Sequence, residues 1–250
     1  MRKYLELFKG SFDDSINEKT KLENKPYIAY STKLGKVMYT VVPAKEEPVS
    51  SAYVTFKAEE ANSTIGLENL SSYQTLEYST DTTTWSNMDT STTITLTNID
   101  DEVYIRGVLS EEYNSRSNYT QFKMTGKIAA SGNCNALWNY QDLNAPLKVW
   151  CGHKMFYNCA SLTVAPELPS QSIYMYCYSY MFANCINLNT VTCLSVGGYD
   201  ENTCATDHWL DNVSVTGTFI KAAGSYWPSY NMDSNYFGIP EGWTVVDAEL

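Results

Sequence analysis

The sequence predicts a mainly β fold in three parts. These are an N-terminal arm with a hairpin (1–48), a small antiparallel β-sandwich (49–130), and a short repeat solenoid with a C-terminal cap (131–250). Three observations lead to this prediction. One pattern occurs twice between 151 and 194, short period-two segments precede it, and the charge balance changes after the first fifty residues.

The repeat is the clearest pattern in the chain. CGHKMFYNCASL (151–162) returns 26 residues later as CYSYMFANCINL (177–188). A period in the twenties with recurring Leu, Phe and Cys is typical of leucine-rich repeats, whose units bury their apolar sides only by stacking on neighbours. The predicted core of this stack comprises Phe156, Cys159, Leu162, Leu168, Phe182, Cys185, Leu188 and Leu194.

The cysteines are predicted to serve packing. Cys159 and Cys185 hold the same place in the two copies, so we expect a ladder of small buried side chains. Seven cysteines, an odd number on repeat spacing, favour a chain folded under reducing conditions over a disulfide scaffold. No Cys-x2-Cys pair occurs, so neither a metal site nor a cofactor is expected.

The end of the repeat predicts a cap. Residues 133–143 form a shortened unit before the first copy, and a decayed third copy begins at Cys204, with Trp209 expected where Phe182 stood. Terminal repeats are atypical because one end of the stack must be closed. The aromatic loop at 225–236 either packs within this cap or forms an exposed contact surface. The candidate receptor contacts are Tyr226, Trp227, Tyr230 and Tyr236.

Residues 52–130 show period-two segments between turn residues, which indicates a small antiparallel sandwich, Ig-like in kind. Trp85 is expected to be its large inward side chain. The predicted strands are 53–56, 75–79, 92–96, 102–106, 119–124 and 126–129.

The first fifty residues differ in charge from the remainder. They carry nine Lys and Arg against seven Asp and Glu, whereas the whole chain has a net charge of −11. Segments 26–31 and 36–42 predict a hairpin, and an isolated hairpin is marginal in water, so it needs a partner sheet. We therefore interpret this part as an anchor. Its predicted anchoring residues are Leu5, Leu7, Phe8, Phe12, Ile16, Tyr27 and Tyr30.

Several function classes are disfavoured by the sequence. The acidic balance argues against nucleic-acid binding. No window reaches transmembrane length, and no secretory leader is recognised. His153 is expected to point outward because Ser179 replaces it in the second copy. Cys204, Asp207 and His208 superficially offer a nucleophile, an orienting acid and a base, but a polar cap is the simpler interpretation. No enzymatic activity is therefore expected.

The repeats resemble a known family. The segments 155–169 and 181–188 are similar to the BspA-type leucine-rich repeats of Bacteroides surface proteins and of fibre proteins of their phages. The segments 24–31 and 35–43 resemble N-terminal parts of virion proteins of crAss-like phages. The chain has only two good repeats, which is short for a long concave binding face.

This resemblance implies a non-enzymatic protein of the virion, on the head or the tail, made in the host cytoplasm and anchored by its N-terminal arm. The implied partners are other virion proteins, further copies of the chain in a closed homo-oligomer that is often a trimer, and a host-surface glycan or protein. Two alternatives stay open at this point: a bacterial BspA-like adhesin and a polysaccharide hydrolase.

Overall fold

The computed structural model describes residues 27–31, 37–41, 52–110, 114–197, 202–229 and 236–249. The chain divides into two compact units, 1–50 and 51–250. Its described part is mainly β with one short helix. The elements are β1 Tyr27–Ser31, β2 Val37–Val41, β3 Val54–Ala58, β4 Ser63–Asn69, β5 Gln74–Ser79, β6 Ser86–Met88, β7 Thr93–Leu96, β8 Glu102–Leu109, β9 Gln121–Thr125, β10 Ile128–Ser131, α3 Ala136–Asn139, β11 Leu162–Val164, β12 Thr190–Cys193, β13 Gly217–Lys221 and β14 Trp243–Asp247.

The N-terminal unit contains the predicted hairpin. β1 and β2 pair antiparallel, from Tyr27 opposite Val41 to Ser31 opposite Val37. The predicted anchoring residues Tyr27 and Tyr30 lie on β1. The other five predicted anchoring residues lie outside the described part of the chain. They are Leu5, Leu7, Phe8, Phe12 and Ile16.

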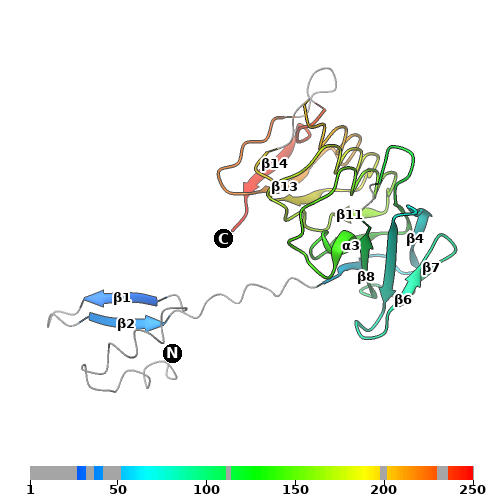
Figure 1. The fold of residues 1–250 in the computed structure, drawn as a ribbon, viewed down its shortest axis with the longest axis horizontal. Coiled ribbons are helices and arrows are strands. Elements are labelled where there is room, and N and C mark those ends of the chain that lie inside the picture. Colours follow the sequence, from blue (N-terminus) through cyan, green and yellow to red (C-terminus); the bar gives the residue numbers. More distant parts are fainter. Residues whose placement is uncertain are drawn as a thin grey trace. The chain divides into compact units, whose positions relative to one another are not determined.

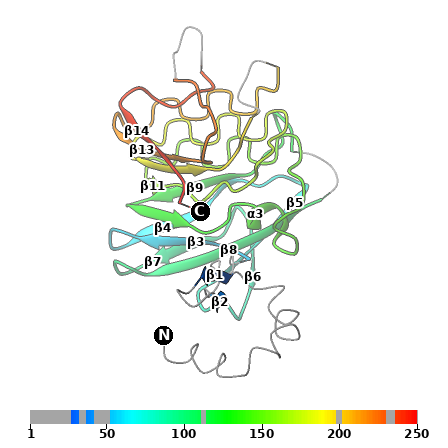
Figure 2. The same cartoon turned by 90° about the vertical axis from the view of Figure 1, so that its left-hand side faces the viewer.

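The second unit is built on one large mixed sheet and one small antiparallel sheet. The large sheet has nine strands in the order β14-β13-β12-β11-β10-β3-β8-β5-β6, and the small sheet has the order β7-β4-β9. The strands from β10 to β14 run parallel, whereas β10, β3, β8, β5 and β6 pair antiparallel. Figure 2 shows β11, β13 and β14 one above another on the antiparallel strands.

Alternating burial explains the antiparallel strands. Along β8, Val103, Ile105, Gly107 and Leu109 are buried, and the residues that alternate with them are half-buried. Period-two burial of this kind is what a sheet with one covered face requires. The six strands predicted in this region correspond to β3, β5, β7, β8, β9 and β10.

Within this region two strands were absent from the prediction, the short β6 and the longer β4. β4 is the central strand of the small sheet, where Ile65 and Leu67 are buried with Gly66 between them. A Cβ at Gly66 would lie 2.8 Å from the carbonyl oxygen of Thr92 on the approach to β7. Glycine is thus needed for close approach of the strands here, and a glycine inside a segment weakens its signal for a strand.

The core runs without a break from the antiparallel strands into the parallel ones. The ring of Phe122 on β9 stacks on that of Phe156 at 5.1 Å, and Phe156 stacks on Phe182 at 5.5 Å. Phe56 on β3 contacts Phe122 at 5.4 Å between ring centroids. Phe122 of the small sheet thus joins Phe56 of the large sheet to the aromatic column that fills the repeats. Figure 1 shows β4 and β7 on the side of this unit away from β13 and β14.

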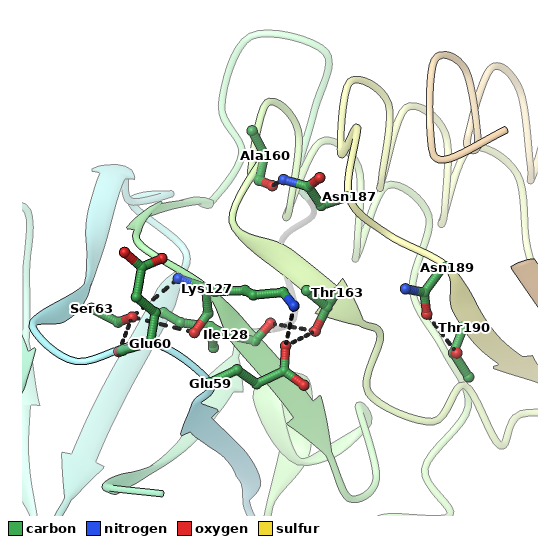
Figure 3. A network of polar contacts seen from close by, with 10 residues as sticks. All are labelled: Glu59, Glu60, Ser63, Lys127, Ile128, Ala160, Thr163, Asn187, Asn189 and Thr190. Atoms are coloured by element: carbon green, nitrogen blue, oxygen red, sulfur yellow. Dashed lines mark hydrogen bonds and ion pairs between the residues drawn. The ribbon is translucent and has the colours of Figure 1, made fainter. Parts of the chain in front are cut away.

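A polar network ties the β3–β4 turn to the first parallel strand (Figure 3). The Thr163 hydroxyl on β11 lies 2.8 Å from Glu59 Oε2 and 3.1 Å from the Ile128 carbonyl oxygen, and its one proton is shared between these two acceptors. Ser63 Oγ accepts from the Lys127 N–H at 3.1 Å. These bonds link the antiparallel part and the stacked part of the unit.

Trp85 does not occupy the core, contrary to the prediction. It is half-buried on the outer side of the large sheet, where the Arg106 guanidinium lies 3.8 Å from its ring centroid. The same guanidinium lies 4.1 Å from the ring centroid of Tyr140, and Glu77 pairs with Arg106 Nε at 2.9 Å. The inward face is already filled by aliphatic side chains and Phe56, so Trp85 packs against a cation instead.

Candidate binding site

The repeats form stacked coils of tight turns whose residues recur in a left-handed conformation every four positions. Nine non-glycine residues of these coils have positive φ values between 48° and 65°. Together their side chains form what we call the turn face, in three columns. The first column is Trp150, Tyr176 and Cys204; the second is Lys154, Tyr180 and His208; the third is Asn158, Asn184 and Asn212.

Hydrogen bonding explains why this strained backbone persists. In the first coil, N–H groups of even-numbered residues from Trp150 to Asn158 donate to carbonyls of the next coil. The N–H groups of odd-numbered residues from Cys151 to Cys159 donate three residues back along the chain. The second coil repeats this alternation. Each backbone N–H of the two turn segments is thus satisfied, which offsets the cost of left-handed residues.

The left-handed positions correct the alignment of the third copy. Cys204 falls 28 residues after Tyr176, in the first column, and not on the cysteine ladder. Ala205 therefore takes the place of Cys177, and Trp209 takes the place of Met181 rather than that of Phe182. The bond from the Phe182 N–H to the Trp209 carbonyl follows the same offset as the bond from Phe156 to Met181.

Most of the predicted core side chains are fully buried. Phe156, Cys159, Leu162, Leu168, Phe182, Cys185 and Leu188 have 0 or 1 % exposure. Leu194, at the end of the second copy, is only half-buried. All seven cysteines are free thiols, and Cys204 is the one that is not fully buried.

Aromatic rings of the turn face stack mainly on one another. Trp150 lies on Tyr176 with ring centroids 4.0 Å apart. His208 is held between Tyr180 at 5.0 Å and Tyr236 at 4.4 Å. These rings cover one another's faces along the columns, so they present mainly edges and polar tips to a ligand.

Charged groups flank these columns. The Lys154 ammonium lies 5.2 to 5.8 Å from the ring centroids of Tyr119, Tyr157 and Tyr180. His208 Nδ1 is 2.5 Å from Asp211 Oδ2, and its Nε2 is 3.9 Å from Asp207 Oδ1. Burial raises the pKa of Asp207 above its usual range. Positive and negative groups thus both lie beside the turn face, so it does not present a surface of a single charge to a ligand.

His153 is buried, not outward as predicted. It is 2 % exposed, its Nδ1 is 3.0 Å from the Ser179 carbonyl, and Ser179 is buried too. Burial, aided by the Lys154 charge, lowers the pKa of His153 to about 4. The ring is neutral at pH 7, with the proton on Nδ1, and packs edge-on against Trp150 and Tyr119.

Two of the four candidate receptor contacts are placed by the structure as parts of the cap. Trp227 is 7 % exposed, stacked on Trp209 at 5.3 Å and packed against Phe219 at 5.1 Å, so this prediction is wrong for Trp227. Tyr236 is half-buried against His208. Tyr226 is 76 % exposed, and Tyr230 lies outside the described residues.

A groove opens beside the first coil, and the sequence did not reveal it. It has a volume of about 460 Å³ and is lined by Asn133, Asn135, the 143–147 loop, the 169–172 loop and Tyr174. Asn135 forms part of its base, where Nδ2 donates to the Leu143 carbonyl at 2.9 Å and to Ser170 Oγ at 3.0 Å. Every lining side chain is uncharged.

The described residues contain no grouping of three or more His, Cys, Asp or Glu side chains suited to hold a metal ion. Over the same part of the chain, no helix has the length and apolarity needed to cross a bilayer. Comparison with protein-family models, with curated proteins and with solved structures finds no match to this chain.

Proposed function

We propose that this chain is a non-enzymatic structural protein of a phage virion, a fibre or decoration subunit of the head or tail. In this proposal, residues 1–48 anchor it to other virion proteins and the rest of the chain is presented to the host surface. The observation that carries the proposal is the division of the chain into a 1–50 unit and a compact 51–250 unit.

The N-terminal hairpin supports an anchoring role. β1 and β2 form a two-stranded sheet to which no other described strand pairs. Two strands alone are marginal in water, so we infer that this sheet is completed by capsid or tail protein, or by sister copies in a closed homo-oligomer such as a trimer. The resemblance of segments 24–31 and 35–43 to crAss-like virion proteins favours the same role.

The C-terminal part supports a presenting role. We propose that residues 131–250 are a short leucine-rich-repeat solenoid of the BspA type, carried by an Ig-like sandwich. Four parallel strands in sequence order, β11 to β14, and the repeating Phe and Cys rungs support the solenoid. The facing β7-β4-β9 sheet supports the sandwich.

A labelling experiment tests the virion proposal. Gold-labelled antibody against residues 51–250 should decorate purified phage particles, and light scattering should show a full-length oligomer. A variant lacking residues 1–48 should keep its fold by circular dichroism but neither assemble nor bind particles. Labelling of the bacterial surface instead, with bare particles, would favour the adhesin alternative and overturn the virion proposal.

The hydrolase alternative rests on Asp207 and His208, which do approach each other on the turn face. We favour a structural role for them because His208 is enclosed by two tyrosine rings and by Asp211. Release of reducing sugar from host polysaccharide, lost in His208→Gln, would reverse this preference.

A further inference from the structure

We propose that the groove beside the first coil binds a neutral saccharide. This inference names a ligand class for the host-surface binding proposed above and rests on it for its biological target. The binding itself stands on the groove alone, whose volume of about 460 Å³ is within the usual range for small-ligand sites.

The lining chemistry matches an uncharged polyol. Asn144, Gln171 and Ser172 are exposed, and their side chains form no hydrogen bond with the rest of the described chain. Amides and hydroxyls both donate and accept, as sugar hydroxyls do. No carboxylate or basic group lines the groove, so it offers no counter-charge to an acidic sugar or a phosphate.

Tyr174 supplies the apolar surface that a sugar ring needs. It lines the groove, is 46 % exposed, and has no ring contact within the described residues. The aromatic rings of the turn face differ, because their faces are largely covered by one another. Tyr174 can therefore offer a ring face to the C–H groups of a pyranose while its hydroxyl stays in water.

The groove is held in shape before any ligand arrives. Asn135 joins the 143–147 loop to Ser170 across the base. The Gln171 carbonyl accepts from the Val196 N–H at 3.0 Å, which fixes the backbone from which the Gln171 side chain projects. A preformed site pays little ordering entropy on binding, which favours recognition of a flexible glycan.

Affinity electrophoresis of the full-length chain tests the proposal, with dextran, mannan or galactan in the gel as neutral probes and polygalacturonate as the acidic probe. We expect at least one neutral polymer to retard the protein, with an affinity that changes less than about twofold between 0.05 and 0.5 M salt. Polygalacturonate should not retard it.

Variants locate the site. Tyr174→Ala removes the ring and Ser172→Trp fills the groove, and each should weaken binding by at least about tenfold, the loss of one good contact. Ile99→Ala is the control, because Ile99 is 59 % exposed and does not line the groove, and this variant should bind like wild type. Circular dichroism should show all three folded.

Three results would overturn the proposal: no retardation by any neutral polymer, salt-sensitive binding to polygalacturonate alone, or an equal loss of binding in Ile99→Ala and Tyr174→Ala. The virion proposal fails separately, through particles that the antibody leaves unlabelled. If the chain binds saccharide but is absent from particles, the saccharide proposal stands and the virion proposal is wrong.

Discussion

The thiol of Cys185 donates a hydrogen bond to the main-chain carbonyl of Phe156, 3.0 Å away in the preceding coil. Cys159 makes the same bond to Phe122 at 3.2 Å. The recurring cysteine thus bonds each coil to the segment before it, and the Cys159 bond reaches back to β9. The repeat is therefore bonded, as well as packed, to the antiparallel strands.

Replacing Cys185 with alanine should destabilise the 51–250 unit by about 1–2 kcal/mol, through a small cavity and one lost weak hydrogen bond. The matched control is Cys204→Ala, because Cys204 is half-buried in the first column of the turn face. Urea unfolding followed by fluorescence measures both, and we expect the loss for Cys204→Ala to be the smaller. Equal losses of stability in the two variants would contradict a stabilising role for the Cys185 hydrogen bond and packing.

The buried thiols should be unreactive in the folded protein. Burial raises the pKa of Cys193 to about 12 and that of Cys159 further still. Because the thiolate is the reactive form, a disulfide reagent at pH 8 should modify at most Cys204 within minutes. All seven cysteines should react in denaturant. Rapid labelling of several thiols, with an unchanged circular dichroism spectrum, would contradict their burial.

Stability should fall as the pH drops from 7.5 to 5 because of His153. Its folded pKa is about 4, below the usual 6.5, so the unfolded chain takes up the proton first. The contribution is complete above about pH 6.5 and is lost as pH falls toward 4, with a loss of about 2 kcal/mol by pH 5.

Urea midpoints at the two pH values measure this effect. The pKa values of Asp207 and Glu167 are raised by burial, and they act in the opposite direction. For each protein, the change in stability between pH 7.5 and pH 5 is measured. The difference between the change in wild type and that in His153→Gln is the contribution of His153, and it does not depend on how much stability the variant loses at pH 7.5. If His208→Gln flattened the pH dependence and His153→Gln did not, the assignment to His153 would be wrong.

Residues 51–250 should unfold in one cooperative transition. Phe122 belongs to the antiparallel part but stacks on Phe156, and β10 pairs with both β3 and β11. A fragment of residues 51–130 would lose both contacts and expose its aromatic column, so we expect it to be unfolded alone. Coincident circular dichroism and fluorescence transitions of the full unit test this. Two separated transitions would show independent parts.

Arg106→Lys should cost about 1–2 kcal/mol, because a lysine cannot keep the flat contacts with Trp85 and Tyr140 together with the bond to Glu77. The control is Lys123→Gln, which removes an exposed pair with Glu68 at 3.0 Å and should cost less than about 0.5 kcal/mol. Thermal unfolding of both variants measures the difference. Similar losses of stability in the two variants would mean that the contacts of Arg106 with Trp85 and Tyr140 do not stabilise the fold.

The sequence alone determined the features that depend on local pattern. Period-two segments located six of the antiparallel strands, since one covered face imposes strict alternation. The 26-residue period identified Phe156, Phe182, Cys159 and Cys185 as buried, because equivalent positions of stacked coils meet the same surroundings. The hairpin of β1 and β2 followed from its two apolar segments and the turn between them.

Other features depend on which surfaces pack together, and these only the tertiary structure decided. β4 was hidden because close approach to the Thr92 carbonyl requires Gly66, and a glycine inside a segment weakens its signal for a strand. Trp85 lies outside because Arg106 offers it a better partner than the filled core, and Trp227 lies inside because Trp209 and Phe219 leave a surface to cover. The third coil slips by two residues because left-handed backbone positions, not cysteines, keep the coils in register. The groove at Tyr174 arises where three segments within 133–174 converge, and the order of residues along the chain does not show that convergence.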